Sequence, residues 1–269
     1  MDKLRIISWN INSIRLRLPL LKQVVSQFSP DVIAVQETKC PDELLPVDDL
    51  KALGFPYMHF SGMKGYNGVI LLSRIPLEGG FTHNRVAKND SRHVEASLIL
   101  PNKKITLHNL YIPAGGDIPD VNENEKFAHK LDFVREITQF MPKYHGKDDH
   151  VVVMGDFNIA PYEHDVWSHK QLLNVVSHTP IEVDLLNKML DAHQWVDVAR
   201  HLVPAEEKLY TWWSYRNRDW RKSNRGRRLD HIWVTPNLTA NIHDFTVAKD
   251  ARDWEKPSDH VPIIFDMTL

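Results

Sequence analysis

A chain of 269 residues can fold as one large domain or two small ones, and 42% hydrophobic with 25% charged residues is typical of a globular protein. The single cysteine excludes an internal disulfide, and no apolar run approaches the roughly 20 residues needed to span a bilayer. Because the net charge is only −2, any attraction to an anionic partner must be local.

The first segments alternate between strand and helix. Residues 4–9 form an apolar run typical of a strand, and nothing before them resembles a secretory signal, so we expect a cytoplasmic protein. Residues 21–28 carry apolar side chains at the spacing of one helix face, and Pro30 ends that helix. A second strand is predicted over 31–35.

Further elements follow the same alternation. Apolar runs predict strands over 68–72, 94–100, 105–111, 151–154, 229–235 and 261–267. Amphipathic spacing predicts helices over 122–141 and 180–193, and long connections are expected over 59–67, 112–120, 160–179 and 216–228. We expect one domain over residues 1–269, with two packed sheets flanked by helices; periodicity alone does not distinguish this from an open doubly wound sheet.

Polar side chains stand where several of these strands end, a position that is costly beside a core unless something binds there. Asp156 and Asn158 share one face of an extended backbone, with Phe157 packed behind them. Glu37 ends the second strand and is the best candidate for a carboxylate ligand of Mg²⁺. The simpler alternative, a strand end facing solvent, is equally favoured for the first pair and favoured for any Glu taken alone.

The first strand offers Asn10 and Asn12 in the same i, i+2 relation. For Asn12 we favour an N-cap of the following helix, whereas Asn10 lies deeper and is a candidate ligand. Near the C-terminus, Asp259 and His260 precede the last strand. Asp230, which follows residues 227–229, is a second carboxylate that could hold His260. A carboxylate bonded to a ring N–H fixes the tautomer of a histidine and favours its protonated form.

A basic and aromatic segment, residues 210–228, is the second informative feature. Seven basic side chains lie between positions 216 and 228 against one acidic side chain, and tryptophans precede and interrupt them. Such a surface neutralises phosphates and stacks on bases or sugars. A solvated charged loop is the usual alternative, but this run leads directly into Asp230.

Taken in order, seven short motifs resemble the exonuclease III family of apurinic/apyrimidinic (AP) endonucleases, within the endonuclease/exonuclease/phosphatase superfamily. They span residues 8–12, 36–39, 65–69, 109–113, 155–159, 228–230 and 255–260. The resemblance implies a four-layered αββα sandwich, with two mixed sheets packed face to face, flanked by helices, and an active site at one end. It implies a monomer that cuts duplex DNA 5′ to abasic sites and processes damaged or recessed 3′ ends.

The resemblance also implies roles for individual residues. The cation, Mg²⁺ with Mn²⁺ as a substitute, would be held by Glu37, Asn10, Asp156, Asn158, Asp259 and His260. Asp156 would activate water with the help of Asn158, His260 held by Asp230 would polarise the phosphate, and Tyr111 would contact it. DNA would be contacted by Lys64, Tyr66, Arg92, Trp212, Arg216, Arg225, Arg227, Arg228 and Leu229.

Two departures from that family concern the abasic pocket. Arg227 stands next to the wall where relatives use an apolar side chain against the abasic sugar, and residues 163–179 do not match the usual DNA-penetrating loop. Incision at abasic sites with accompanying 3′ exonuclease and 3′ phosphodiesterase or phosphatase activity is the leading hypothesis. The alternatives are an enzyme working mainly on 3′ ends, a lipid-headgroup phosphodiesterase of the same fold, and a DNA-binding module without catalysis.

Overall fold

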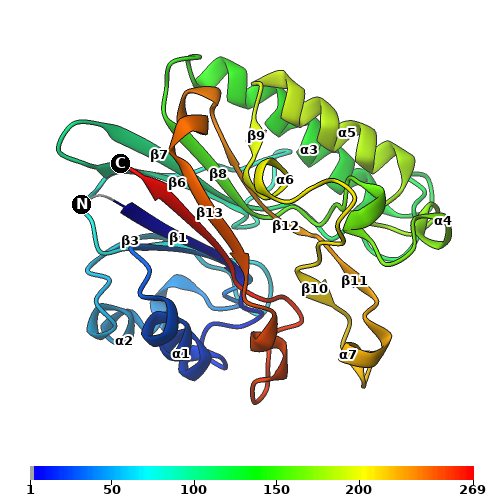
Figure 1. Cartoon of the computed structure of the whole chain (residues 1–269), viewed down its shortest axis with the longest axis horizontal. Helices are drawn as coiled ribbons and strands as arrows, with labels where there is room; N and C mark the ends of the chain where they lie inside the picture. Colours follow the sequence, from blue (N-terminus) through cyan, green and yellow to red (C-terminus); the bar gives the residue numbers. More distant parts are fainter. Residues whose placement is uncertain (1–2) are drawn as a thin grey trace.

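The computed structural model describes residues 3–269, which form two six-stranded sheets packed face to face with helices on both outer faces (Figure 1). The first sheet has the order β13-β14-β1-β2-β4-β3 and the second β5-β6-β7-β8-β12-β9. Strands of the first sheet are β1 Lys3–Asn10, β2 Val32–Gln36, β3 Tyr57–Ser61, β4 Val69–Ser73, β13 Ile242–Val247 and β14 Ile263–Thr268. Strands of the second are β5 Leu77–Thr82, β6 His93–Ile99, β7 Lys104–Tyr111, β8 Val151–Asp156, β9 Val196–Asp197 and β12 Asp230–Val234.

Helices close the two outer faces. Helices α1 (Leu18–Phe28) and α2 (Val47–Ala52) pack on the first sheet, and α3 (Glu125–Tyr144) and α5 (Pro180–Ala192) pack on the second. The sequence fixes the start of α5, because Thr179 and Glu182 cap each other's backbone N–H and Pro180 occupies the first turn. Shorter elements complete the fold: α4 His169–Leu172, α6 Val198–Leu202, α7 Trp220–Ser223, and the ribbon of β10 Trp212–Trp213 and β11 Gly226–Arg227.

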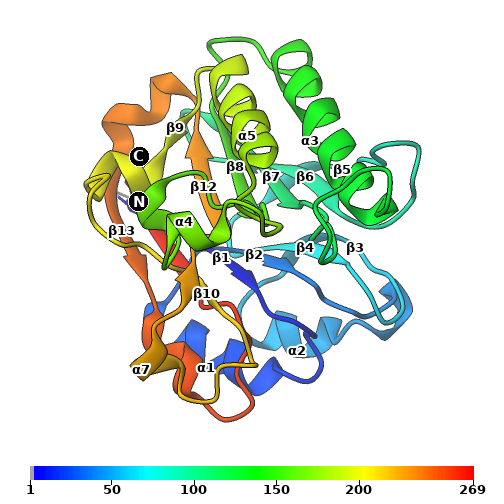
Figure 2. The same cartoon turned by 90° about the vertical axis from the view of Figure 1, so that its right-hand side faces the viewer.

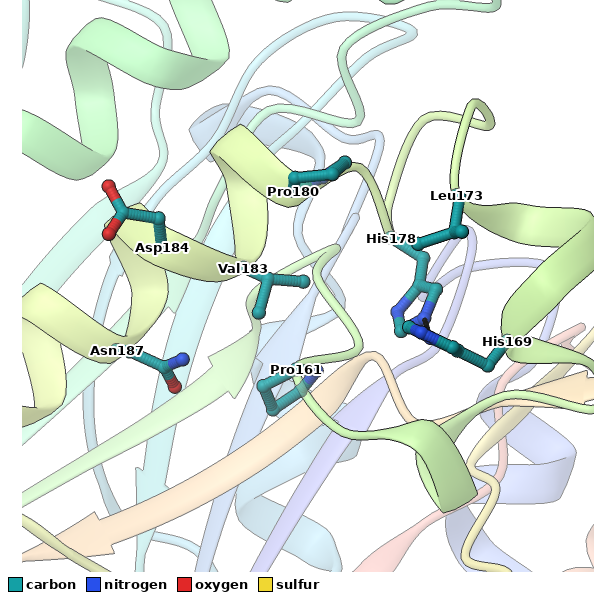
Figure 3. A pocket seen from close by; sticks show the side chains of 8 residues that line it. All are labelled: Pro161, His169, Leu173, His178, Pro180, Val183, Asp184 and Asn187. Carbon is teal, nitrogen blue, oxygen red and sulfur yellow. Dashed lines mark hydrogen bonds between the residues drawn. The ribbon is translucent and has the colours of Figure 1, made fainter.

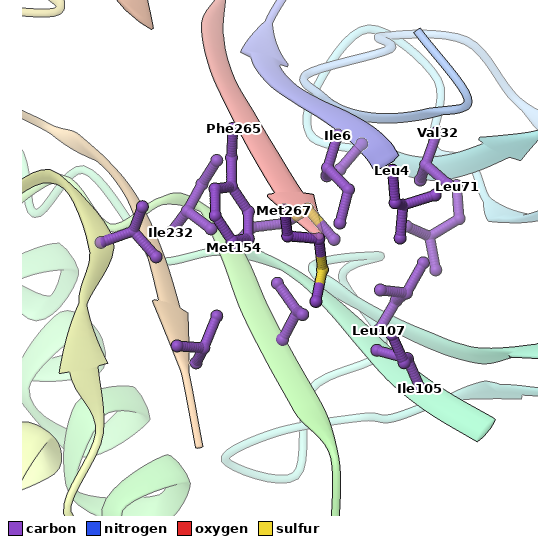
Figure 4. Packing of buried hydrophobic residues seen from close by; sticks show 14 of the residues in the cluster. Leu4, Ile6, Val32, Leu71, Ile105, Leu107, Met154, Ile232, Phe265 and Met267 are labelled. Atoms are coloured by element: carbon purple, nitrogen blue, oxygen red, sulfur yellow. The ribbon is translucent and has the colours of Figure 1, made fainter. Parts of the chain in front are cut away.

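The main core lies between the two sheets (Figure 4). Leu4 and Ile6 of β1 point inward and meet side chains of the second sheet such as Met154, while the next residue, Ile7, packs outward beneath α1. Because both faces of the central strands are covered, β2, β4 and most of β8 are nearly continuous apolar runs. That is why the central strands could be predicted from the sequence.

One buried amide joins the two sheets close to the end where the polar clusters gather. Asn109 of β7 donates from Nδ2 to the carbonyl oxygens of Val35 and Ile70 in the other sheet, both at 2.9 Å. Its Oδ1 accepts from Gln36 Nε2 at 2.7 Å. These bonds hold β7 at a fixed separation from β2 and β4.

The four-layered sandwich is confirmed, and each predicted strand and helix is present with shifted ends. The largest shift is in α3, predicted over 122–141 and observed over Glu125–Tyr144. Four strands of the two large sheets were not predicted, β3, β5, β9 and β13, and all four lie at sheet edges; the two-residue strands β10 and β11 were not predicted either. Edge strands are half-exposed, and β5 contains Gly79 and Gly80, so apolar periodicity does not reveal them.

Three of the expected connections also contain regular structure. The segment 59–67 begins inside β3, 160–179 contains α4, and 216–228 contains α7 and β11. Within residues 3–269, no helix has both the length and the hydropathy to cross a membrane.

Candidate active site

A cleft of about 630 Å³ opens at one end of the sandwich. Strand β10 and helix α4, which lie near it in the chain, are on the side turned toward the viewer in Figure 2. The first, second and eighth strands end there, and β12 and β14 begin there. Side chains from both sheets therefore reach the same rim, including Glu37, Asn158, Asp259 and His260.

Asn10 connects the carboxylates of the two sheets. Its buried Nδ2 donates to Glu37 Oε1 at 2.8 Å and to Asp156 Oδ2 at 2.9 Å. Tyr111 adds a hydroxyl donor to Glu37 Oε1 at 2.9 Å, and Lys39 Nζ lies 2.8 Å from Oε2. The residues predicted from separate motifs are thus within hydrogen-bonding distance of one another.

Left-handed backbone conformations place several of these side chains. Glu37 has φ 52°, Asn158 φ 54° and Asn12 φ 49°, values that are uncommon outside glycine and are often found at functional sites. The turn at Glu37 is held because its carbonyl accepts from Ser13 N at 2.8 Å and the next residue, Thr38, donates to Gly68 O at 3.0 Å. Local strain here is balanced by hydrogen bonds from neighbouring loops.

The prediction that Asn12 caps a helix is wrong. Helix α1 begins at Leu18, and the Asn12 side chain instead donates to Asp259 Oδ1 at 3.1 Å and accepts from Lys39 Nζ at 2.7 Å. The left-handed turn directs its amide toward Asp259, which lines the cleft.

Asp156 is oriented by the residues that follow it. Asn158 donates to it twice, from the backbone N–H to Oδ1 at 2.9 Å and from Nδ2 to Oδ2 at 3.1 Å, while Phe157 is buried behind in the core under α3. A side chain at Gly155 would lie 1.9 Å from Leu110 O, so glycine is needed for β8 to approach β7. Burial raises the pKa of Asp156 to about 7, against the lowering effect of the His260 charge.

His260 sits between two carboxylates. Its Nδ1 is 2.9 Å from Asp230 Oδ2 and its Nε2 is 3.6 Å from Asp156 Oδ2. Thr211 Oγ1 donates to the same Asp230 oxygen at 2.6 Å. Burial alone would lower the pKa of His260, but the charges of Asp230 and Asp156 outweigh it and raise the pKa to about 10. The ring is therefore a cation at neutral pH.

The pKa values of Glu37 and Tyr111 shift in opposite directions. Burial would raise the pKa of Glu37, but the charge of Lys39 and the hydrogen bond from Asn10 keep it below its ordinary value. Burial, together with the charge of Glu37, raises the pKa of Tyr111 well above its ordinary range. Glu37 is an anion and Tyr111 a neutral O–H donor.

The donor set fits a divalent cation of the Mg²⁺ type. Four carboxylates, Glu37, Asp156, Asp230 and Asp259, converge on two cationic side chains, Lys39 and His260. The oxygen-rich character and the excess negative charge suit a hard cation. Ligand atoms of Asp156, Asp230 and His260 lie within 4.8 Å of one another, but a protonated imidazole has no lone pair to give. Glu37 and Asn10 offer oxygen atoms on the other side of Asp156, and the place of His260 as a metal ligand stays a prediction.

Basic and aromatic side chains line the outer part of the cleft, as the sequence predicts. Trp212, Arg216, Arg225, Arg227 and Leu229 all line it. A second hollow of about 650 Å³ shares Tyr111 with the cleft and is lined by Tyr66 and Arg92, and Lys64 is exposed beside Tyr66. The predicted DNA contacts thus flank the acidic cluster on two sides.

Arg228 is an exception, and its prediction as a DNA contact is wrong. It is fully buried, with ion pairs to Asp165 at 2.9 Å and to Asp197 at 2.7 Å. Two carboxylates already neutralise its charge, so it anchors the residues before Asp230 instead of meeting phosphate.

The segment 163–179 forms one wall of the cleft and, on its other side, a separate cavity of about 350 Å³ against α5 (Figure 3). There His169 Nδ1 lies 2.8 Å from His178 Nε2, and His178 Nδ1 lies 2.6 Å from Ala160 O. Burial lowers the pKa of His178, so the ring is neutral, donates to Ala160 O and accepts from His169. This pair fixes the segment that carries Val176 and Ser177.

Histidines also gather far from the cleft, on the outer face of the second sheet beneath α3. Arg85 donates to His93 Nδ1 at 3.2 Å, His93 Nε2 lies 2.8 Å from His108 Nδ1, and His108 Nε2 lies 2.6 Å from His145 Nε2. His145 Nδ1 completes the row 3.5 Å from Asp149. Each ring can accept on one side and donate on the other, so this histidine relay is satisfied with neutral rings.

Three residues of the site were missed by sequence reasoning. Asn12 was assigned to a helix cap, Lys39 was noted only within a motif, and Thr211 was given no role although it binds Asp230. Lys39 follows Glu37 closely and could have been found. Thr211 lies 19 positions from its partner, and no local pattern connects them.

Comparison with known proteins extends over nearly the whole chain. The model of the Endonuclease/Exonuclease/phosphatase family matches residues 7–260. Exodeoxyribonuclease III of Haemophilus influenzae is 33% identical over 97% of this chain and 98% of its own length. An AP endonuclease from Archaeoglobus fulgidus has a TM-score of 0.90 at 32% identity, covering 97% of this chain and 98% of its own. A 3′ phosphatase from Neisseria, bound to product DNA hairpin, has a TM-score of 0.87 at 28% identity, covering 97% and 98%.

Proposed function

Because this chain belongs to the Endonuclease/Exonuclease/phosphatase family, we propose that it is a metal-dependent DNA repair nuclease that hydrolyses the phosphodiester bond 5′ to abasic sites in duplex DNA. The same cleft would remove blocking groups or nucleotides from 3′ ends. We further propose that it works in the cytoplasm as a monomer, as a single catalytic domain, with Mg²⁺ as the cation and Mn²⁺ as a substitute.

One observation carries this proposal. A single amide, Asn10, touches both Glu37 and Asp156 beside a histidine cation held by Asp230, and basic and aromatic side chains line the same cleft. An anionic backbone can approach along the basic walls, while the acidic cluster needs a cation before a phosphate can enter.

The residues divide the chemistry between them. Asp156, aligned by Asn158, would take a proton from the attacking water, and its raised pKa suits a general base. Protonated His260 would donate from Nε2 to a phosphoryl oxygen, with Asp230 and Thr211 holding the ring. Tyr111, which stays an O–H donor, would contact the phosphoryl group from the side of β7.

Water would attack phosphorus, the P–O3′ bond would break, and the 3′ oxygen would take a proton from solvent. A divalent cation near Glu37, Asn10 and Asp259 would offset the charge that develops on the phosphoryl group and the leaving oxygen. Catalysis of this kind rests on positioning and charge stabilisation.

The test uses one duplex with a central abasic analogue, one with a recessed 3′ end and one with a 3′-phosphate, each with Mg²⁺ and with EDTA. We expect metal-dependent cleavage 5′ to the lesion and metal-dependent release at the 3′ ends. A protein that binds these duplexes and cleaves none of them in Mg²⁺ or Mn²⁺ would contradict the proposal. The relative rates measure the balance between incision and 3′-end processing.

A further inference from the structure

Arg227 is an unusual lining for a cleft that receives part of a DNA chain. Its backbone is fixed on both sides, since Arg227 O accepts from Thr211 N at 2.9 Å and Val166 bridges to it from the other side. The guanidinium lies over the ring of Trp212, 5.3 Å from the ring centroid. The side chain is half-buried, in contrast to Arg216 and Arg225 of the same cleft, which are exposed.

One side of this guanidinium is hydrogen-bonded within the protein, and the other side has no hydrogen-bond partner among the described residues. The Nη1 atom donates to Val176 O at 3.0 Å and to Ser177 Oγ at 2.7 Å. Within residues 3–269, Nε is buried without a hydrogen-bond partner, and Arg227 forms no ion pair. The nearest acidic influence is Glu182, which is already paired with Lys130.

The free edge, Nε with Nη2, has the fork geometry that matches a carboxylate or phosphate with two parallel hydrogen bonds. A half-buried cation without an anionic partner is costly, and a bound anion would reduce that cost. The site is also close to the chemistry, because Trp212 beneath the guanidinium donates from Nε1 to Asp259 Oδ2 at 2.9 Å and its backbone bridges to His260.

We propose that Arg227 is a specificity-determining residue that recognises a short carboxylate-bearing remnant esterified to a 3′-terminal phosphate, as in a 3′-phosphoglycolate end. Arg216 and Arg225 are exposed and can meet backbone phosphates, whereas half-buried Arg227 lies over Trp212 in the cleft, where it can meet a group that enters. The inference rests on the proposed nuclease function and assigns to Arg227 the choice among its 3′-end substrates.

The reaction is an ordinary hydrolysis. Water attacks phosphorus, its proton passes to Asp156, and the P–O3′ bond breaks. The products are a DNA end with a 3′-hydroxyl, which takes a proton from solvent, and 2-phosphoglycolate, whose carboxylate Arg227 holds until release.

The experiment compares three 3′ ends on one duplex: a phosphoglycolate, its neutral 2-hydroxyethyl phosphate analogue, and an unmodified nucleotide. In the wild-type protein we expect kcat/KM for the glycolate to exceed that for the hydroxyethyl ester by about 10- to 100-fold, the usual worth of a charge-assisted hydrogen bond. Arg227→Leu should bring this ratio close to one mainly by lowering the rate on the glycolate. Arg227→Lys should keep part of the ratio, since it retains the charge and loses the fork.

Arg135→Leu is the matched control, because it removes one arginine charge from the exposed face of α3, away from the cleft, and should leave the ratio unchanged. A wild-type ratio near one, or a ratio that survives Arg227→Leu, would overturn the inference. So would an equal dependence of unmodified-nucleotide release on Arg227, which would indicate contact with a base. If Arg227→Leu fails to fold, as judged by circular dichroism, Arg227→Lys decides the outcome. Absence of metal-dependent release from all three ends, and of incision at an abasic site, would instead contradict the proposed function itself.

Discussion

The cleft and the outer face of the second sheet both bury histidines, but the two places give them opposite charges. His260 has Asp230 on one side and Asp156 on the other, and its pKa is raised to about 10. In the histidine relay, burial and the neighbouring rings hold the pKa of His93 and of His108 well below the ordinary value. Burial lowers the pKa in both places, so the neighbours decide the charge.

The difference separates a candidate catalytic histidine, His260, from histidines that hold the fold together. His260 is a cation aimed into a cleft, where it can stabilise negative charge that develops on a phosphate. The relay is a chain of hydrogen bonds that starts at the Arg85 guanidinium and runs through His93 and His108 to His145. Because His145 caps α3, the chain holds the end of that helix on the sheet. Burial by itself does not mark a histidine as functional; His260 differs from the relay in having a carboxylate facing each of its two ring nitrogens.

Removing the carboxylate of Asp156 should have the largest effect on the cleft. We expect Asp156→Asn to lower the single-turnover cleavage rate by about 10²–10³-fold, as loss of one key polar group does, with DNA binding kept. Quenched-flow cleavage and fluorescence anisotropy measure the two quantities. Equal cleavage by wild type and variant would show that the role assigned to Asp156 is wrong.

Removing the carboxylate behind His260 tests the origin of its charge. Asp230→Asn should lower the His260 pKa in the metal-free protein and slow cleavage by about 10–100-fold, the usual effect of losing a partner that orients a site residue. Proton NMR titration of the His260 ring follows the pKa directly. An unchanged titration would mean that Asp156 alone sets the charge.

Breaking the relay should affect stability and spare the chemistry. His108→Leu leaves the His93 donor and the His145 acceptor without their partner, so the free energy of unfolding should fall by about 1–3 kcal/mol. Urea unfolding measures the loss, and cleavage of an abasic duplex by the folded variant should match the wild type. A large loss of cleavage with an unchanged free energy of unfolding would contradict the claim that the relay has no part in the chemistry of the cleft.

Acid should weaken the relay before it affects the rest of the core. An unfolded histidine binds a proton near its ordinary pKa of 6.5, but folded His93 and His108 resist protonation, so their contribution is complete above pH 6.5 and is lost as the pH falls below it. We expect about 1 kcal/mol lost per histidine between pH 6.5 and 5.5 in urea unfolding. His108→Leu should show a shallower dependence than wild type.

How far the sequence predicts the fold depends on how each strand is covered. Central strands such as β2 and β8 are buried on both faces, and their unbroken apolar runs locate them within two residues. Edge strands β3, β5 and β13 have one partner and more exposed side chains, so their composition resembles that of a loop.

The same reasoning applies to the site. Glu37, Asp156 and His260 could be predicted because each follows or precedes a recognisable strand and carries a polar neighbour. Arg228 was misjudged because its partners Asp165 and Asp197 come from distant segments. The relay is invisible in the sequence for the same reason, since its rings come from two strands and the end of a helix. Pairings that depend on tertiary contacts leave no local signal.

The amide of Asn109 has a consequence for anyone who redesigns this protein. It acts as a spacer: by tying β7 to β2 and β4 it sets the gap across which Glu37 on one sheet and Asp156 on the other must both reach Asn10. A core repacked with larger side chains would widen that gap and pull the two carboxylates apart, although no reactive group had been altered. The distance between the two sheets therefore helps to set the geometry of the candidate active site.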